Sequence, residues 1–460
     1  MPPKYHIHTA HVPNRFQPIT RSGVIAWEEG CLKCARCVKK DCVYNVYEKR
    51  GIDARQMIES LDSACKDCFR CVQGCPNRLI QKGLNPAYKV LGDHYWTPEI
   101  ISGLWYQAES GSIPVSGAGY GGPFSGPGFD AMWTDMSEIV RPTRDGIHGR
   151  EYISTTVDIG RKVMALEFDQ TGALAVSPPP LIEIPLPILF DILPWSPPRR
   201  GINQVFLEGA ASIGTFTVVR QSEFNPAMEA YLPHTVLFAD GNVSDIDPSI
   251  IRELRMVEIP YGENVIALQN KLKEKNPGLV VLIRMDLGPD SSEHVLRLTR
   301  DGAEAIHLLA DEYGLENAER PLFIKERMKE IHLKLVDRGM RDQITLIAGG
   351  GIAMAEHVAK LIICGADLLS MDIPLLVAME CRVCRRCKEG IACPVGLDSV
   401  DPVWGAGRIR NLLSGLHNQL IEILGAMGIR EVRRLRGEMG RAMFYDNLER
   451  DFFAVLGKKG

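Results

Sequence analysis

The stretch that decides the fold reads ITLIAGGGIAMAEHVAKLIICGADLLSM and covers residues 344–371. A short apolar run at 344–348 leads into three glycines, an amphipathic segment at 355–364 and a second apolar run at 368–371. Short apolar runs bounded by turn residues are typical of strands in a buried parallel sheet, and the segment between them has the length of a crossover helix. The stretch therefore predicts a strand–helix–strand unit with parallel strands.

The same alternation extends back through the middle of the chain. Eight candidate strands lie at 181–190, 214–219, 235–239, 256–259, 280–284, 305–309, 344–348 and 368–371. Helical patterns separate them, the clearest at 265–275, 292–301, 325–338 and 355–364. This alternation predicts an α/β fold, here a (β/α)8 TIM-type barrel over residues 176–380. In such barrels the chemistry takes place where the strands end.

Two glycine-containing segments flank the helix between the seventh and eighth strands. They comprise Gly349, Gly350, Gly351 and Ile352 after strand seven, and Gly365, Ala366 and Asp367 before strand eight. The last loops of this barrel often bind phosphate through backbone amides, which glycine leaves accessible. Three glycines alone are weak evidence, but both segments at the spacing of one helix favour a flavin phosphate. We therefore predict that these seven residues bind FMN.

Twelve of the thirteen cysteines lie in three groups of four, and only Cys364 lies alone, in an apolar context. The groups are Cys31, Cys34, Cys37 and Cys42; Cys65, Cys68, Cys71 and Cys75; and Cys381, Cys384, Cys387 and Cys393. The first thirty residues contain no signal-peptide pattern, so we expect a cytoplasmic protein with reduced thiols. Metal ligation is then the expected use of so many clustered cysteines.

The first two groups read C-x2-C-x2-C-x4-C and C-x2-C-x2-C-x3-C-P, a pattern typical of two-cluster ferredoxins. Such domains take the fourth ligand of each cluster from the other group. We predict a ferredoxin-like domain over residues 1–95, with one [4Fe-4S] cluster on Cys31, Cys34, Cys37 and Cys75 and a second on Cys65, Cys68, Cys71 and Cys42. A pair of zinc sites is the alternative, but a triple run offers more thiolates than one tetrahedral ion uses.

The third group has all four thiolates close together in the sequence, within a loop at 381–404. Its simplest interpretation is a third [4Fe-4S] cluster, and a [3Fe-4S] cluster on three of the cysteines is the nearest rival. Four cations interleave with these cysteines, namely Arg382, Arg385, Arg386 and Lys388. They either offset the charge of a cluster or belong to a solvated basic loop.

The remaining segments are a linker and a cap. Residues 96–175, which are rich in glycine and proline at 116–130, predict a linker that wraps over the barrel. Apolar residues at helical spacing predict a helical C-terminal cap over 405–460. The net charge of −4 gives no electrostatic footprint for nucleic acid, and no apolar run is long enough to span a membrane.

The segment from 347 to 402 resembles the FMN- and iron–sulfur-binding end of the glutamate synthase large subunit. The matching residues are Gly350, Gly351, Gly365, Ala366, Asp367, Cys381, Cys387, Cys393, Pro394, Val395 and Gly396. A ferredoxin-like domain ahead of such a barrel is similar to archaeal-type, glutaminase-free glutamate synthases. Bacterial members of that family bind a [3Fe-4S] cluster with three cysteines, so the additional Cys384 favours four irons here.

The resemblance fails at the loops that hold substrate. Arg284 stands where the family has a lysine near flavin and 2-oxoglutarate, and the loop after His307 lacks the family's glycines. Arg284 and His307, with Arg199 and Arg200, are the remaining candidates for holding a dicarboxylate. The alternative is that Arg284 is an ion-paired residue at a strand end and that Arg199 and Arg200 form a solvated turn.

These observations lead to three hypotheses. We favour an oxidoreductase with three [4Fe-4S] clusters and FMN that transfers electrons within a larger redox complex, under anaerobic conditions. Its partners would be ferredoxin or other iron–sulfur or flavin subunits. The alternatives are a ferredoxin-dependent glutamate synthase that uses 2-oxoglutarate and ammonia, and a flavin-free scaffold for the clusters.

Overall fold

The computed structural model describes residues 5–26, 30–47, 65–113, 126–134, 152–175, 177–195, 201–448 and 450. The chain divides into two compact units. The first consists of Met1–Val12, Tyr106–Met379 and Arg385–Gly460, and the second of Pro13–Trp105 and Glu380–Cys384. No helix among the described residues is both long and apolar enough to cross a membrane.

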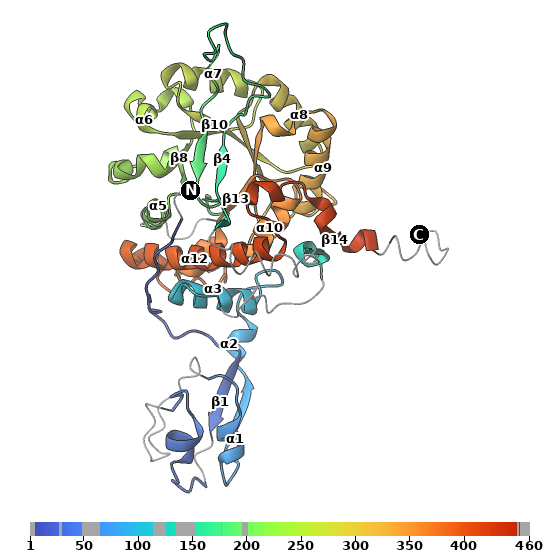
Figure 1. Ribbon diagram of the computed structural model, residues 1–460. Helices are drawn as coiled ribbons and strands as arrows, with labels where there is room; N and C mark the ends of the chain where they lie inside the picture. Colours follow the sequence, from blue (N-terminus) through green and yellow to red (C-terminus); the bar gives the residue numbers. More distant parts are fainter. Residues whose placement is uncertain are drawn as a thin grey trace. The chain divides into compact units, whose positions relative to one another are not determined.

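The first unit contains a closed barrel of eight parallel strands (Figure 1), which confirms the predicted fold. The strands are β6 (Ile188–Phe190), β7 (Thr217–Arg220), β8 (Thr235–Phe238), β9 (Met256–Pro260), β10 (Val280–Asp286), β11 (Ala305–Leu309), β12 (Thr345–Gly349) and β13 (Leu368–Met371). Their neighbouring pairs are all parallel, and β13 closes the barrel by pairing with β6. All eight predicted strands overlap an observed strand of the barrel.

One predicted strand is longer than the structure allows. The run at 181–190 divides into β5 (Ile182–Ile184), which pairs antiparallel with β4 (Val157–Ile159), and the barrel strand β6. Pro185 and Pro187 lie between the two strands. Because proline has no amide to donate to a ladder, the run cannot continue as one central strand.

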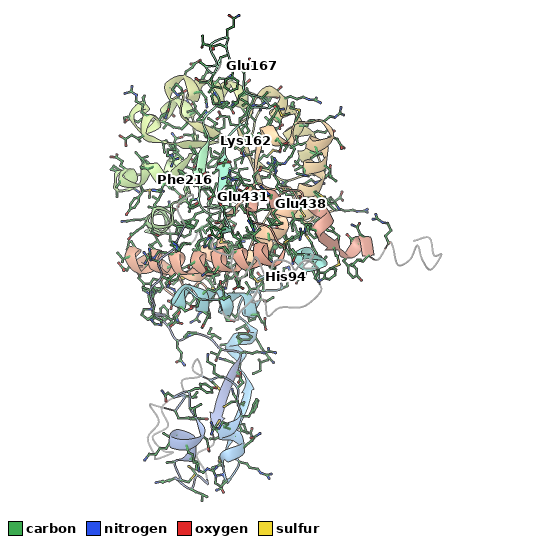
Figure 2. All side chains as sticks on the ribbon, in the orientation of Figure 1. His94, Lys162, Glu167, Phe216, Glu431 and Glu438 are labelled. Carbon is green, nitrogen blue, oxygen red and sulfur yellow. The ribbon has the colours of Figure 1, made fainter. Side chains whose placement is uncertain are left out.

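Helices surround the barrel and bury their apolar faces against it. They are α5 (Ile202–Ile213), α6 (Pro248–Glu253), α7 (Val265–Lys275), α8 (Ser291–Asp301), α9 (Ile324–Asp337), α10 (Ala355–Ile363) and α11 (Ile373–Ala378). Side chains are drawn throughout the structure in Figure 2, and Phe216, directly before β7, is only 1% exposed. The four predicted helices correspond to α7, α8, α9 and α10.

The C-terminal extension is built on α12 (Pro402–Ala426), which packs along α5. The side chain of Asp401 caps it by accepting a hydrogen bond from the amide of Trp404 at 3.0 Å. Two buried polar residues on α12 hold the N-terminal segment: Arg408 donates to the carbonyl of Val12 at 3.0 Å, and Asn411 to that of Ala10 at 2.7 Å. The helix therefore ties the segment with Ala10 and Val12 to the barrel.

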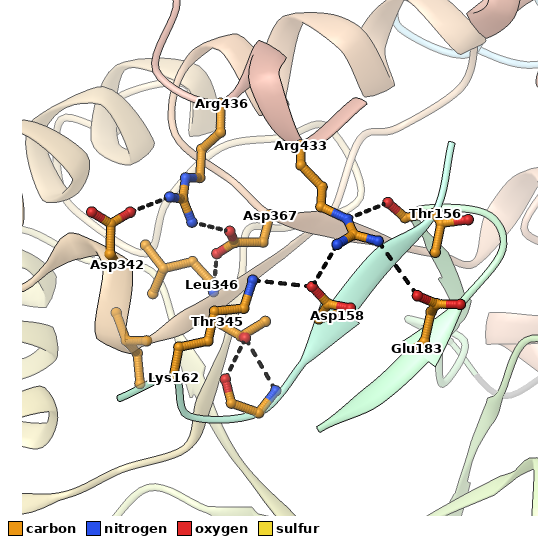
Figure 3. A network of polar contacts seen from close by, with 12 residues as sticks. Thr156, Asp158, Lys162, Glu183, Asp342, Thr345, Leu346, Asp367, Arg433 and Arg436 are labelled. Atoms are coloured by element: carbon orange, nitrogen blue, oxygen red, sulfur yellow. Dashed lines mark hydrogen bonds and ion pairs between the residues drawn. The ribbon is translucent and has the colours of Figure 1, made fainter. Parts of the chain in front are cut away.

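The end of the barrel at which the strands begin is covered by the β4–β5 hairpin. Thr345, the first residue of β12, exchanges hydrogen bonds of 3.1 and 2.8 Å with the backbone of Gly160 (Figure 3). Arg433, from the chain's C-terminal part, donates to the carbonyl of Thr156 at 2.9 Å and pairs with Asp158 at 3.0 Å. This end is thus closed by protein, which leaves the other end for chemistry.

The second unit has little regular structure. Strands β1 (Ser22–Ala26) and β2 (Ile80–Leu84) pair antiparallel, beside the short helices η1 (Cys37–Asp41), α1 (Arg70–Gly74) and α2 (Pro86–Lys89). Helix α3 (Pro98–Ser110) contains the boundary at Trp105. The unit also includes Glu380, which lies outside the predicted 1–95 domain. The carboxylate of Glu380 accepts hydrogen bonds from the backbone amide of Arg15 at 2.7 Å and from the Arg15 side chain at 3.1 Å.

One hydrophobic cluster among the described residues of this second unit is rich in cysteine. Its buried members are Val46, Tyr47, Cys71 and Ile80, and the side chains packed against them are Cys37, Val38, Cys42, Cys65, Val72 and Cys75. Half of these ten residues are cysteines. None of these five cysteines forms a disulfide, and metal binding can stabilise such a cysteine-rich cluster.

Candidate functional site

Five polar side chains meet inside the barrel, and we call them the barrel ring. Its members are Asp191, Glu258, Arg284, His307 and Ser370. Arg284 donates to Asp191 at 2.8 Å and to Glu258 at 3.0 Å. His307 contacts Glu258 at 2.5 Å and Ser370 at 2.7 Å, and Ser370 donates to Asp191 at 3.0 Å. Each member therefore has two partners within the ring.

The barrel ring is almost completely buried. The side chains of Glu258 and His307 are 0% exposed, that of Asp191 is 5% and that of Arg284 is 14%. Burial raises the pKa of Asp191, but the charges of Arg284 and His307 lower it more, so this carboxyl stays ionised. Burial lowers the pKa of Arg284, but Asp191 and Glu258 raise it more. The two candidate catalytic residues, Arg284 and His307, are thus held by internal partners.

Gly349 makes room for the barrel ring. A Cβ atom at this position would lie 2.2 Å from the hydroxyl oxygen of Ser370, 2.8 Å from a methyl of Leu309 and 3.3 Å from Nε2 of His307. Any side chain would collide with the hydrogen bond that joins His307 to Ser370. The first glycine of the triplet therefore has a structural use that does not depend on a ligand.

Asp372 lies directly after β13, at the end of the barrel where the strands finish. Its side chain accepts a hydrogen bond from the amide of Ile373 at 2.6 Å and so caps α11. Burial raises the pKa of Asp372 to about 7, and the charges of Asp191 and Glu312 add to the increase. This carboxyl can therefore hold or release a proton near neutral pH.

The predicted flavin-phosphate residues lie at opposite ends of the barrel. Residues 349–352 follow β12 where the strands finish, whereas 365–367 precede β13 where they begin. Asp367 accepts hydrogen bonds from Arg341 and Arg436, each at 2.7 Å, and from the amide of Leu346 at 2.8 Å (Figure 3). One phosphate cannot contact both segments, and Asp367 instead anchors the C-terminal part of the chain.

Residues 349–352 keep the properties of an anion site. Gly350 and Gly351 have φ angles of 103° and 67°, and a Cβ at Gly350 would lie 2.5 Å from the carbonyl oxygen of Ala310. Among the described residues, no hydrogen bond from the buried amides of Gly350 and Ile352 is found. Buried amides require partners, and a phosphate at this strand end would supply them. These residues therefore fit the phosphate of FMN.

A cleft opens at the same end of the barrel, beside Asp191. The described residues around it include Trp195, Asn203, Arg220 and Glu223, and its volume is about 100 Å³. Typical cofactor pockets measure roughly 300–1,000 Å³. The cleft formed by these residues is thus a small part of what a whole flavin requires. Arg199 and Arg200, two further candidates from the sequence, lie outside the described residues.

Two cations of the third cysteine loop contact this end of the barrel. Arg385 and Lys388 pair with Glu312, in the loop after β11, at 3.3 and 2.9 Å. The guanidinium of Arg385 also lies 5.3 Å from the ring centres of both Trp195 and Tyr313. Arg385 is therefore held against the barrel, whereas Lys388 pairs with Glu312 but stays 40% exposed.

The three triple-cysteine runs share one backbone conformation. In each run the residues on both sides of the middle cysteine have positive φ angles. They are Lys33 (53°), Ala35 (55°), Asp67 (54°), Phe69 (58°), Val383 (51°) and Arg385 (54°). Such angles are unfavourable for residues other than glycine, by about 1–2 kcal/mol each, and most of all for β-branched residues such as valine. The repetition indicates a shared requirement in all three runs.

A cavity in the second unit brings together cysteines from both N-terminal groups. It is lined by Cys42, Cys65, Cys68 and Cys71, which are the four ligands predicted for the second cluster. Lys82 also lines the cavity and donates a hydrogen bond to the sulfur of Cys65 at 2.8 Å. For the first cluster, the amide of Leu79 donates to the sulfur of Cys75 at 3.3 Å.

Within the described part of the chain, no three cysteine, histidine or carboxylate side chains are grouped closely enough to bind one metal ion. Zinc holds its cysteine ligands at about 2.3 Å, which forces four sulfurs close together. A [4Fe-4S] cluster binds each thiolate through a different iron, and its ligands stand farther apart. The four cysteines that line the cavity therefore stay a predicted [4Fe-4S] site, with zinc as the alternative.

Comparison with known proteins finds similarity to glutamate synthases. Residues 312–441 match the conserved region in glutamate synthase. The archaeal-type glutamate synthase (NADPH) of Dehalococcoides mccartyi is 24% identical, over 89% of this chain and 92% of its own length. The archaeal glutamate synthase (NADPH) of Archaeoglobus fulgidus is 23% identical, over 94% and 96% of the two chains. The chain is thus similar to archaeal-type glutamate synthases over nearly its whole length.

Among solved structures, a mutant flavocytochrome b2 with pyruvate bound is similar over 69% of this chain and 88% of its own, with 11% identity and a TM-score of 0.41.

The region matched to glutamate synthase, 312–441, includes Glu312, Ser370 and the third cysteine group, whereas the other four members of the barrel ring precede it.

Sequence reasoning missed Asp191, Glu258 and Ser370 in the barrel and Lys82 beside Cys65. The signal for Glu258 was available, because it is a single acid within the apolar strand MVEIP, and Ser370 likewise interrupts LLSM. A lone polar residue in a buried strand must find a partner. Which partner it finds depends on the closure of the barrel and could not be inferred from the pattern.

Proposed function

We propose that this glutamate synthase relative is an iron–sulfur and FMN oxidoreductase that transfers electrons as a subunit of a larger redox complex and does not make glutamate. Its partners would be ferredoxin or other iron–sulfur or flavin subunits in the cytoplasm. The proposal rests on the state of Arg284.

Arg284 takes the place of the lysine that the family has near flavin and 2-oxoglutarate. A dicarboxylate substrate needs a cation that is available to it, but Arg284 is already bound to Asp191 and Glu258. The ring places two buried carboxylates against this one guanidinium. A bound dicarboxylate would add negative charges that Arg284, already paired with two carboxylates, does not balance. Unbalanced charge is costly in a buried site.

The arrangement of the cysteine groups supports an electron path. The shared backbone conformation favours three clusters of one kind, on the three sets of four cysteines predicted from the sequence. Glu312 and Trp195 hold Arg385 and Lys388, neighbours of Cys384 and Cys387, at the end of the barrel where the strands finish. A cluster on that loop would be next to any redox group at the barrel mouth.

FMN, when bound, exchanges two electrons with its reaction partner and passes single electrons to clusters. In this chain the amides of Gly350 and Ile352 would hold its phosphate. Asp372, whose pKa is about 7, could supply or accept the accompanying proton at the same end of the barrel. Neither role requires a site for 2-oxoglutarate.

The test uses the full chain, purified without oxygen. Iron, sulfide and FMN are measured per chain, the protein is reduced with a low-potential donor, and 2-oxoglutarate with ammonia is then added. We expect about twelve irons for three clusters and one FMN, full reduction, and no faster reoxidation with the substrates. The Archaeoglobus fulgidus relative serves as the positive control. A protein that no donor reduces would contradict electron transfer.

Ferredoxin-dependent glutamate synthesis is the second candidate. Glutamate synthesis is favoured by the match over nearly the whole length of relatives named glutamate synthase (NADPH), whereas the use of ferredoxin is our own inference from the cysteine groups. It requires 2-oxoglutarate to alter the flavin spectrum and glutamate to be formed. If the purified protein keeps its clusters but releases no FMN, both the FMN-dependent electron transfer and the glutamate synthesis are excluded. The flavin-free scaffold for the clusters then remains.

A further inference from the structure

His357 lies on α10, shortly after the glycine triplet, and its ring contacts the loop that joins the triplet to the helix. The backbone amide of Ala353 donates a hydrogen bond to Nδ1 of His357 at 3.1 Å. The side chain of His357 is only 5% exposed, and its ring stacks on that of Phe129 with 4.1 Å between the ring centres. A buried imidazole against a loop that fits a phosphate needs an explanation.

The ring of His357 is neutral and uses both of its nitrogens. Burial and the charge of Lys360 lower the pKa of His357 well below its usual 6.5, although a hydrogen bond with the backbone of Gly351 raises it. A hydrogen bond that favours the protonated ring is one that the ring donates, so the carbonyl of Gly351 accepts it. Because Nδ1 already accepts from Ala353, the donated proton is on Nε2.

These two hydrogen bonds hold the backbone on both sides of Ile352. The carbonyl of Gly351 and the amide of Ile352 belong to one peptide unit, and in a trans unit they point in opposite directions. The contact with His357 therefore turns the amide of Ile352 away from the imidazole ring. The loop is also confined elsewhere, since a Cβ at Gly351 would lie 2.6 Å from the amide nitrogen of Gly314.

His357 is itself fixed by its surroundings. The ring of Phe129 that stacks on it also meets Phe323 edge-on, with 4.8 Å between the ring centres. The ammonium of Lys360, on the same helix as His357, donates to the carbonyl of Phe129 at 2.8 Å. A loop that is held in its binding conformation loses less conformational entropy when a ligand binds. These contacts therefore favour binding at the amides of Gly350 and Ile352.

We propose that His357 is a positioning residue, which holds the loop of Gly350, Gly351 and Ile352 in the conformation that binds phosphate. It would thereby give the barrel a preference for FMN over riboflavin, the related flavin without a phosphate. This inference rests on the proposed function, because it requires the barrel to bind FMN. His357 acts through the loop and does not touch the reacting atoms.

Flavin titration of the full chain, after removal of its own flavin, tests the proposal with FMN and riboflavin as ligands. The wild type should bind FMN more tightly than riboflavin. His357→Leu loses both hydrogen bonds, and we expect its affinity for FMN to fall about tenfold, the effect of about one hydrogen bond, with no change for riboflavin. His357→Gln keeps an N–H donor near the place of Nε2 and should recover most of the loss. His8→Leu, at an exposed position, is the control and should leave both affinities unchanged.

The two flavins separate positioning from damage to the fold. An equal loss for both flavins in His357→Leu would show a merely structural role and overturn the inference. An unchanged affinity of His357→Leu for FMN would also overturn it, as would a wild type that binds both flavins equally. In these three cases the wild type still binds FMN, so the proposed function stands. A wild type that binds no FMN would overturn the proposed function first.

Discussion

Arg284 and Asp191 form an ion pair across the interior of the barrel, with Nη1 and Oδ1 2.8 Å apart. Arg284 belongs to β10 and Asp191 follows β6, and these strands are separated by three strands in either direction around the barrel. The pair therefore joins opposite walls. Together with Glu258, His307 and Ser370, it fills with protein groups the space where a small substrate would otherwise reach the centre.

Replacing Arg284 should strongly destabilise the barrel. In Arg284→Met, Asp191 and Glu258 would remain buried without their cation, and removing one partner of a buried ion pair costs about 3–5 kcal/mol. Urea unfolding measured by tryptophan fluorescence gives the free energy. Arg338→Met, at an exposed position, is the matched control and should change it by less than about 0.5 kcal/mol. Equal effects of both variants would show that the ring contributes nothing to stability.

The first glycine of the triplet should not tolerate a methyl group. Gly349→Ala would place Cβ 2.2 Å from the hydroxyl of Ser370, and we expect a loss of about 1–3 kcal/mol from overpacking. Gly262→Ala is the control, since a Cβ there meets nothing within 4 Å. If Gly349→Ala is as stable as Gly262→Ala, the close packing of Gly349 on the ring is refuted.

Asp372 predicts a definite dependence of stability on pH. Its pKa is raised from 3.8 to about 7 in the folded protein, so the folded chain keeps a proton that the unfolded chain releases between about pH 4 and 7. The free energy of unfolding therefore falls as pH rises through this range and is level above it.

Asp372→Asn removes this dependence and keeps the cap on Ile373. Relative to the variant, the wild type should lose about 2 kcal/mol between pH 5.5 and 7, because one pKa unit corresponds to about 1.4 kcal/mol. Urea unfolding at several pH values measures the difference. Asp245→Asn, which changes an exposed carboxylate, is the control. Parallel pH profiles for all three proteins would contradict a raised pKa.

Cys384 should decide the type of the third cluster. If its sulfur is a ligand, Cys384→Ser should convert a four-iron cluster into a three-iron cluster, with about one iron less per chain and a paramagnetic signal in the oxidised state. Cys364→Ala is the control because Cys364 is fully buried beside Met132, away from the cysteine loops. An unchanged spectrum and iron content in Cys384→Ser would favour the [3Fe-4S] rival.

The repeating strand and helix patterns predicted the barrel because periodicity depends on local sequence alone. The prolines at 185 and 187 were visible as well, yet the run around them was predicted to be one strand. The cysteine spacing likewise predicted four ligands that line one cavity. The strands and the triple-cysteine runs are predicted by signals within a few residues, whereas Cys42 joins the cavity from another part of the sequence.

The barrel ring and the role of Asp367 could not be predicted in this way. Arg284 meets Asp191 only because the barrel closes, and 93 residues separate the two in the sequence. The segments 349–352 and 365–367 looked like one site because a single helix joins them. That helix carries the chain from one end of the barrel to the other, so neighbours in sequence become distant in space.

The most direct test of the central claim is glutamate formation by the fully reduced protein, with clusters and FMN intact, given 2-oxoglutarate and ammonia. The account predicts reduction by a low-potential donor and no glutamate above the level without enzyme, since Arg284 is bound to Asp191 and Glu258. Glutamate formed in proportion to the electrons consumed would contradict it and establish a glutamate synthase with an altered substrate site.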